Sequence, residues 1–204
     1  MPELILASSS PQRRAILEQL GVAFRTIVPD VEELSAGPPE ELVLENAHRK
    51  AAAAARSLGS EDRSEPGQGG GAAAAAPLVL GVDTIVALGA SVYGKPADER
   101  EARDTLGALS GRTHRVLSGV CLMQGGRARS AAAVTNVSFR LVDRRTLDWY
   151  LASGEWRGRA GGYAIQGRGA ALVQQIDGDY LNVVGLPVAT LLDLHPSALF
   201  PSIS

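Results

Sequence analysis

The amino-terminal stretch constrains the fold of this chain more than any other part of it. Residues 4–7 (LILA) form the short apolar run that is typical of a buried strand. Three serines at positions 8–10 follow, and apolar residues then recur at helical spacing. Ser10 suits the N-cap of that helix, and Pro11 suits its first turn, where a missing N–H costs nothing. The stretch therefore predicts a strand, a tight loop and a helix that ends at Gly21.

The amino end of this helix has the chemistry of an anion site. Serine hydroxyls, free backbone N–H groups and two arginines converge there on the positive end of the helix dipole, which suits a phosphate or a carboxylate. Arg13 lies four residues before Leu17 and heads the apolar stripe, whereas Arg14 lies four before Glu18 and faces solvent. We therefore expect Arg13 to face a ligand. A helix start that is simply well capped uses the same groups, so this stretch alone leaves that alternative open.

Composition narrows the class of protein. The 204 residues are enough for one domain or two tightly joined lobes, and with 45% hydrophobic but only 4% aromatic residues the core should be aliphatic. A net charge of −2 argues against a broad surface for nucleic acid or membrane. No apolar run approaches the roughly 20 residues that span a bilayer. The polar residues 8–14 interrupt the first apolar run, so we expect no signal peptide and a cytoplasmic protein.

Strand-like and helix-like segments alternate along the chain and predict an α/β fold. The expected helices cover residues 11–20, 39–55, 98–109, 145–151 and 186–194. The expected strands cover residues 4–7, 22–31, 77–83 (continued by residues 85–88), 116–123, 131–139, 171–176 and 180–183. The last two strands flank an Asp-Gly turn, which is a strong hairpin signal. Residues 58–76 are rich in Gly, Ser, Ala and charge, and we interpret them as a flexible surface loop rather than a domain boundary.

Two acidic sites stand at predicted strand ends. Asp83 follows a strand that is apolar on both faces, and such strand ends line the ligand crevice of open α/β sheets. Glu32 and Glu33 follow the predicted strand at residues 22–31. One carboxylate of this pair and the carboxylate of Asp83, together with phosphate oxygens of a ligand, would suit Mg²⁺. Asp83 capping a turn with Thr84, and a solvated Glu32–Glu33 pair, are the alternatives that the pattern leaves open.

Basic residues and glycines supply further candidates. Lys50 lies on the small-residue face of its predicted helix, and Lys95 stands between Gly94 and Pro96, which define the backbone around it. Ordinary surface lysines remain an alternative for both. The glycine-rich residues 158–169 suggest a loop that approaches a ligand closely, although they lack the spacing of common phosphate motifs, and glycine there would equally let strands cross closely.

Histidine and cysteine chemistry can be set aside. The three histidines are far apart, and with a single cysteine they offer no zinc-ligand spacing and no intramolecular disulfide. Cys121 lies in an apolar run and is expected to be a buried, inert thiol. We expect His114 to be a hydrogen-bonding loop residue rather than a base.

Seven motifs follow one another along nearly the whole chain. They are ASSSPQRRAILEQLGV, the VEE at 31–33, the AHRKA around Lys50, GVDTIV, GKP, SGRTHRV, and GRAGGYAIQG with the following Asp-Gly turn and NVVGLP. Together they resemble the Maf family of nucleoside triphosphate pyrophosphatases. The resemblance implies a single domain over residues 1–204 with the inosine-triphosphatase-like fold, a mixed twisted sheet with helices on both sides and two lobes around a deep cleft. It also implies hydrolysis of a nucleoside triphosphate to the monophosphate and pyrophosphate, a divalent cation (Mg²⁺ or Mn²⁺) and a homodimer.

The resemblance also assigns roles residue by residue. Asp83 matches the family's proton acceptor, and with Glu33 it would hold the metal. The positions that match the phosphate-binding residues are Ser8, Ser10, Arg13, Lys50 and Lys95. Thr84 and Gln166 match positions tied to base selection and are of the type found in the subgroup that acts on dTTP and UTP, not the subgroup that acts on 7-methyl-GTP.

The chain departs from the family pattern at two positions. Gln12, which belongs to the base-selecting set, stands where the dTTP/UTP subgroup has arginine, and this opens the alternative of a modified or purine base. Arg159 stands where lysine is usual, which keeps the charge, and we expect a phosphate role there. A further alternative is a nucleotide-binding regulator of cell division or septum formation without turnover. Such a regulator would not need Glu33, Asp83 and the two lysines.

Overall fold

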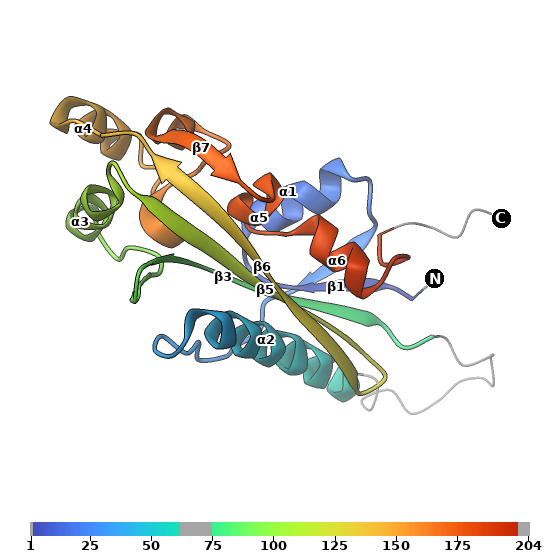
Figure 1. The fold of residues 1–204 in the computed structure, drawn as a ribbon. Helices are drawn as coiled ribbons and strands as arrows, with labels where there is room; N and C mark the ends of the chain where they lie inside the picture. The colour runs from blue at the N-terminus through green and yellow to red at the C-terminus, as the bar shows by residue number, and fades with distance from the viewer. Residues whose placement is uncertain (1, 62–74, 200–204) are drawn as a thin grey trace.

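A seven-stranded mixed sheet organises the fold in the computed structural model, which describes residues 2–61 and 75–199 (Figure 1). Its strands are β1 (Leu4–Ala7), β2 (Phe24–Ile27), β3 (Leu78–Leu88), β4 (Ser91–Tyr93), β5 (Thr113–Gln124), β6 (Arg127–Phe139) and β7 (Val173–Asp177). The order is β2-β1-β3-β5-β6-β7, and β4 pairs with the carboxyl half of β3. β1 is parallel to both of its neighbours, and the other pairs are antiparallel. The predicted α/β class with a mixed sheet is confirmed.

Helices cover both faces of this sheet (Figure 1). They are α1 (Pro11–Gln19), α2 (Pro39–Glu61), α3 (Glu99–Leu109), α4 (Arg144–Ala152), α5 (Tyr180–Val184) and α6 (Val188–Leu194), with 3₁₀ turns at Ala160–Gly162 and Arg168–Leu172. Within the described residues, no helix combines the length and the apolar character needed to cross a membrane.

The apolar sequence of β1 reflects burial on both faces. Leu4 and Leu6 join a cluster with leucines of α1 and α6, whereas Ile5 and Ala7 pack on the other face against the alanines of α2. Successive side chains of a strand point to opposite faces, so a four-residue strand must be wholly apolar to be covered on both sides. The predicted helix after it is confirmed, and Gly21 follows its end with a φ of +66°.

Two glycines let α2 lie unusually close to the sheet. A Cβ atom at Gly81 of β3 would collide with the carbonyl oxygen of Ala47, and one at Gly119 of β5 would collide with that of Val43. The facing side of α2 is built from buried small residues, among them Ala51. The close approach brings the polar residues of α2 within reach of β3, and this positions the candidate site.

The sheet has a gap beside the middle of β3. β1 ends at Ala7, opposite Gly81, and the pairing with β4 starts only at Val86. Residues 82–85 therefore have no strand neighbour on that side among the described residues. The predicted continuation of the strand through residues 85–88 is confirmed, but the expectation that Asp83 stands at a strand end is wrong. β3 runs unbroken past Asp83 to Leu88 because both β4 and β5 pair with its second half.

Other expectations also need correction. Residues 58–61 continue α2 rather than starting the predicted loop, and residues 62–74 of that loop lie outside the described residues. Residues 180–183 form helix α5 and not a strand, since the Asp179 side chain accepts a hydrogen bond from the N–H of Leu181 and caps a helix there. His114 lies inside β5 and not in a loop.

Replacing Gly119 with alanine should lower the free energy of unfolding by about 1–3 kcal/mol, because the added methyl group must push α2 away from the sheet. Gly107 is the matched control: it lies exposed in α3, where an added methyl group would meet only open space, so alanine there should raise stability by up to about 1 kcal/mol. Urea unfolding of both variants measures the difference. An unchanged stability for Gly119→Ala would contradict the close packing of α2.

Candidate functional site

A cavity of about 530 Å³ opens against the unpaired stretch of β3. It is bounded by the amino end of α1, by α2 and the segment before it, by β3, and by the loops around residues 95 and 159–166. The residues predicted from sequence that line it are Ser10, Gln12, Arg13, Glu33, Lys50, Asp83, Thr84, Lys95 and Gln166. Ser8 does not line the cavity but lies behind it, where its hydroxyl accepts a hydrogen bond from Arg13 at 2.9 Å. The fold thus gathers residues that are far apart in the sequence.

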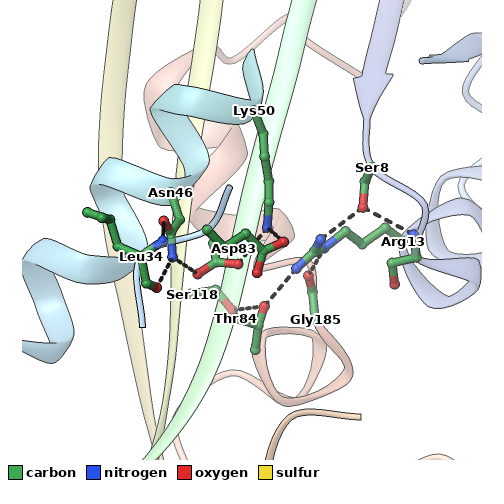
Figure 2. Close-up of polar contacts among 11 residues, drawn as sticks. Ser8, Arg13, Leu34, Asn46, Lys50, Asp83, Thr84, Ser118 and Gly185 are labelled. Atoms are coloured by element: carbon green, nitrogen blue, oxygen red, sulfur yellow. Dashed lines mark hydrogen bonds and ion pairs between the residues drawn. The ribbon is translucent and has the colours of Figure 1, made fainter. Parts of the chain in front are cut away.

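Asp83 and Lys50 form a buried ion pair at the centre of the site (Figure 2). The Lys50 ammonium donates to Asp83 Oδ1 at 2.6 Å and to Glu33 Oε1 at 2.8 Å. Asn46 donates from Nδ2 to the second oxygen, Asp83 Oδ2, at 3.1 Å. Each carboxylate oxygen has two lone pairs, so both oxygens of Asp83 keep an acceptor position.

The acidic groups of the site suit a cation that arrives with an anionic ligand. Glu33 and Asp83 both accept from the same Lys50 nitrogen, so their oxygens converge on one point. No cluster of three His, Cys, Asp or Glu side chains with metal-binding geometry occurs in the described part of the chain. Mg²⁺ characteristically takes one or two carboxylates and completes its shell with substrate phosphates and water, and the donor set fits that pattern.

Asn46 is a site residue that the sequence analysis did not single out. Its Oδ1 accepts from the N–H of Leu34 at 2.8 Å, and its Nδ2 donates to the Leu34 carbonyl at 3.0 Å as well as to Asp83. The side chain therefore clamps the irregular segment that carries Glu33 onto α2 (Figure 2). The available signal was the four-residue spacing from Lys50, which puts both polar groups on one face of α2.

Arg13 connects three parts of the fold. Its Nε donates to the Gly185 carbonyl at 2.8 Å, one terminal nitrogen donates to Ser8 Oγ, and the other donates to Thr84 Oγ1 at 3.0 Å (Figure 2). Burial lowers the pKa of the guanidinium from its ordinary value, while the nearby charges of Asp83 and Glu33 raise it. A guanidinium has five N–H donors, so two remain for a ligand in the cavity.

The amino end of α1 presents unoccupied donors. Ser10 stands at the N-cap position as predicted, but its side chain makes no capping hydrogen bond and instead donates to Gln12 Oε1 at 3.2 Å. The first-turn N–H groups that a cap would satisfy are left for a ligand. Arg14 points away and pairs with Glu18 at 3.5 Å on the exposed side of the helix, as expected.

The glycine-rich loop closes the other wall. Gly161 has a φ of +67° and packs against Val86 of β3, where a Cβ atom would collide, and its N–H donates to the Gly94 carbonyl at 2.9 Å. This contact sets Arg159 and Gln166 beside the segment that carries Lys95. The glycines therefore serve close packing, and that packing is what brings the loop to the cavity.

Positive charge exceeds negative charge in the cavity. Four cationic side chains, Arg13, Lys50, Lys95 and Arg159, face the carboxylates of Glu33 and Asp83. Lys95 is exposed and makes no ion pair within residues 2–61 and 75–199, and the buried Nε of Arg159 finds no hydrogen-bond partner there. Burial also lowers the pKa of Arg159. A cavity of this charge suits a polyanion such as a phosphate chain.

Comparison with known proteins agrees with this geometry. A family model described as "Maf-like protein" matches residues 3–196. The chain belongs to the Maf family. A dTTP/UTP pyrophosphatase of Symbiobacterium thermophilum is 46% identical over 92% of the chain and 90% of the relative. Proteins with the same name from Pelotomaculum thermopropionicum (43%, 95% of each chain) and Pyrococcus furiosus (38%, 95% of the chain and 94% of the relative) are also similar to this Maf-family chain.

His114 lies behind the cavity wall of this Maf-family chain. Its Nε2 shares a hydrogen bond of 2.9 Å with the hydroxyl of Tyr163, which lines the cavity, and its Nδ1 has no partner in the described part of the chain. Burial lowers the pKa of the imidazole to about 4 and raises that of the Tyr163 hydroxyl. The expected hydrogen-bonding role is confirmed, although the residue lies in a strand.

Replacing Asn46 with leucine should lower kcat/KM by about 5–100-fold, because the backbone N–H and carbonyl of Leu34 lose their partner and one oxygen of the buried Asp83 carboxylate loses a donor. Amide exchange at Leu34 should become faster, which activity alone would not reveal. Glu45→Gln, one residue away on the exposed side of α2, is the control and should change neither quantity. Unaltered exchange at Leu34 would show that Asn46 does not hold the segment.

Acid should destabilise the protein through His114. The unfolded imidazole binds a proton near pH 6.5, whereas the buried one does so only near pH 4, so this contribution to stability is complete above pH 6.5 and is lost as the pH falls to 4. The loss is on the order of 3 kcal/mol. Urea unfolding at pH 7 and pH 4.5 should show a smaller decrease for His114→Gln than for the unsubstituted protein. If the free energy of unfolding decreased equally in the variant and the unsubstituted protein, His114 would not be the source of the acid destabilisation.

Proposed function

We propose that this protein hydrolyses a nucleoside triphosphate to the monophosphate and pyrophosphate, and that dTTP and UTP are its preferred substrates. The observation that carries the proposal is the arrangement in one cavity of a buried carboxylate, Asp83, opposite the uncapped amino end of α1 and four cationic side chains. The names of the similar proteins from three organisms support the reaction and the pyrimidine substrates.

The triphosphate lies across the amino end of α1. Arg13, Lys50 and Lys95, with Arg159 from the opposite wall, neutralise its charge, and the first-turn N–H groups and Ser10 bind its oxygens. Ser8 acts from behind by orienting the guanidinium of Arg13. Because the phosphate chain needs positioning and charge stabilisation more than covalent assistance, most of the rate should come from these groups.

Asp83 accepts the proton of the attacking water. A bond forms between the water oxygen and the α-phosphorus, the bond from that phosphorus to the α–β bridging oxygen breaks, and pyrophosphate leaves. Lys50 and Asn46 hold the Asp83 carboxylate in place for this step. Glu33 and Asp83 would hold the divalent cation, Mg²⁺ or Mn²⁺, which when bound supplies further neutralisation of the phosphate charge.

Gln12, Thr84 and Gln166 meet the base and sugar. Thr84 Oγ1 accepts from Arg13 and shares a hydrogen bond of 2.8 Å with Ser118, so its position is set by the same network as the phosphate site. Gln166 is exposed at the cavity rim, and Gln12 is half-buried beside Ser10. Gln12 puts a neutral amide where the dTTP/UTP subgroup has arginine. The side-chain amides of Gln12 and Gln166 can each donate and accept hydrogen bonds at the edge of the base.

The test is pyrophosphate release from a panel of dTTP, UTP, CTP, dATP, GTP and 7-methyl-GTP with Mg²⁺. We expect dTTP and UTP to have the highest kcat/KM and EDTA to remove the activity. Asp83→Asn should reduce turnover by about 10²–10⁴-fold while nucleotide affinity stays within a few-fold. Asp104→Asn, an exposed acid of α3, is the control and should leave turnover unchanged.

Each result separates the candidates. Binding without pyrophosphate release from any member of the panel would favour the regulator and refute the enzyme. Release that is highest for a purine or a modified base would refute the pyrimidine assignment but keep the reaction. Full turnover in Asp83→Asn would show that Asp83 is not the acceptor of the proton from the attacking water.

A further inference from the structure

A fully buried hydroxyl, that of Ser118 in β5, lies behind the cavity residue Thr84. The two residues are opposite each other in the antiparallel pair of β3 and β5, and their side-chain oxygens are 2.8 Å apart (Figure 2). From Leu78 to Ala87, every residue of β3 except Thr84 is buried, and Thr84 borders the cavity. The pair therefore connects the interior of the sheet with the space for a ligand.

One acceptor position of Thr84 is already occupied. A terminal nitrogen of Arg13 donates to Thr84 Oγ1 at 3.0 Å, and a guanidinium has only donors, so the direction of this hydrogen bond is fixed. A hydroxyl group has two acceptor lone pairs and one hydrogen. The hydrogen bond with Ser118 must therefore use either the second lone pair of Thr84 or its hydrogen.

Burial decides the direction of the hydrogen bond between these two hydroxyls. The Ser118 side chain makes no other hydrogen bond within residues 2–61 and 75–199. If Thr84 donated, the hydrogen of Ser118 would be buried without an acceptor, which is costly. If Ser118 donates, its hydrogen is paired, and the hydrogen of Thr84 is left for water or a ligand in the cavity. The hydrogen bond therefore runs from Ser118 to Thr84.

We propose that Ser118 is a positioning residue that makes Thr84 a pure hydrogen-bond donor to the ligand, and that the site thereby selects a pyrimidine with a carbonyl oxygen at C4 over one with an amino group there. Both lone pairs of Thr84 are occupied, one by Arg13 and one by Ser118, so only its hydrogen faces the cavity. This inference rests on the proposed function, in which Thr84 meets the base.

The chemistry of the pyrimidines fits a fixed donor at this position. Thymine and uracil have an acceptor oxygen at C4, whereas cytosine has an amino group that donates. An amino group opposite the Thr84 hydrogen would bring two donors together and leave both without an acceptor. A site with a fixed hydrogen-bonding group rejects a mismatched analogue strongly for this reason. Ser118 thus contributes to selectivity without touching the ligand.

The experiment measures pyrophosphate release from UTP, from CTP and from the triphosphate of 2-pyrimidinone riboside, which lacks a substituent at C4. In the unsubstituted protein, kcat/KM for UTP should exceed that for either of the others by about tenfold or more. Ser118→Ala frees a lone pair of Thr84, whose hydroxyl can then turn and accept from the cytosine amino group. The ratio of kcat/KM for UTP to that for CTP should fall by about fivefold or more, with a gain for CTP and none for the 2-pyrimidinone nucleotide.

Two further variants separate this role from a merely structural one. Ser118→Thr keeps the hydroxyl and suits a strand, so it should keep the UTP-to-CTP ratio of the parent. Ser138→Ala is the matched control, because Ser138 and Thr113 form the same kind of cross-strand pair, also at 2.8 Å, and neither lines the cavity. This control should leave kcat/KM for all three nucleotides unchanged.

Ser118→Ala leaves no buried polar group without a partner, so its urea unfolding midpoint should stay close to that of the parent. Ser118→Cys, which has a weaker donor, is a second variant and should shift the UTP-to-CTP ratio in the same direction. A parent that does not distinguish UTP from CTP, or a ratio that neither variant changes, would overturn the inference and leave the proposed reaction intact. Absence of pyrophosphate release from every triphosphate would overturn the reaction and the inference with it.

Discussion

The ion pair between the Lys50 ammonium and the Asp83 carboxylate is buried, and the other polar contacts of the site are arranged around it. Removing one partner of a buried pair leaves an uncompensated charge and typically costs about 3–5 kcal/mol. Lys50 also reaches Glu33, and Asn46 occupies the second oxygen of Asp83, so the carboxylate is held from two sides. Such a group keeps its orientation before any ligand arrives, which is what charge stabilisation in phosphoryl transfer requires.

This ion pair depends in turn on backbone packing. Lys50 and Asn46 reach β3 only because α2 lies against the sheet at Gly81 and Gly119, where no side chain separates helix and strand. The same region of β3 lacks a neighbour between β1 and β4, so Asp83 faces a cavity rather than another strand. Two features that weaken an ordinary sheet, glycine in a strand and an interrupted edge, thus create the site.

The two walls of the cavity share one network. Arg13 donates to Ser8, to Thr84 and to the Gly185 carbonyl, and so connects the loop after β1 with β3 and with the turn between α5 and α6. A change in the residues proposed to meet the base is therefore expected to affect the phosphate site as well. The base-selecting and phosphate-binding groups should not be treated as independent in mutational analysis.

Local sequence patterns determined the elements whose periodicity is strong. The first strand and helix, the long alanine-bearing helix and the hairpin of β5 and β6 follow from apolar spacing, caps and turn residues. The same patterns, with the resemblance to the Maf family, named Asp83, Lys50 and other residues that line the cavity, but not Asn46. Where periodicity is short or ambiguous the patterns failed. Residues 180–183 are helical through the cap of Asp179, and Asp83, expected at a strand end, lies inside β3 because β4 and β5 pair with the second half of that strand.

Only the tertiary structure decided how these residues meet. Nothing local to Asn46 indicates that its amide joins Leu34 to Asp83, because that contact depends on how closely α2 approaches β3. Nor does the sequence around Ser10 show that its hydroxyl leaves the helix end uncapped. The reason is physical. Periodicity and capping report interactions between residues a few positions apart, whereas a site built from segments that are far apart in the sequence depends on long-range packing, which the spacing within any one segment does not encode.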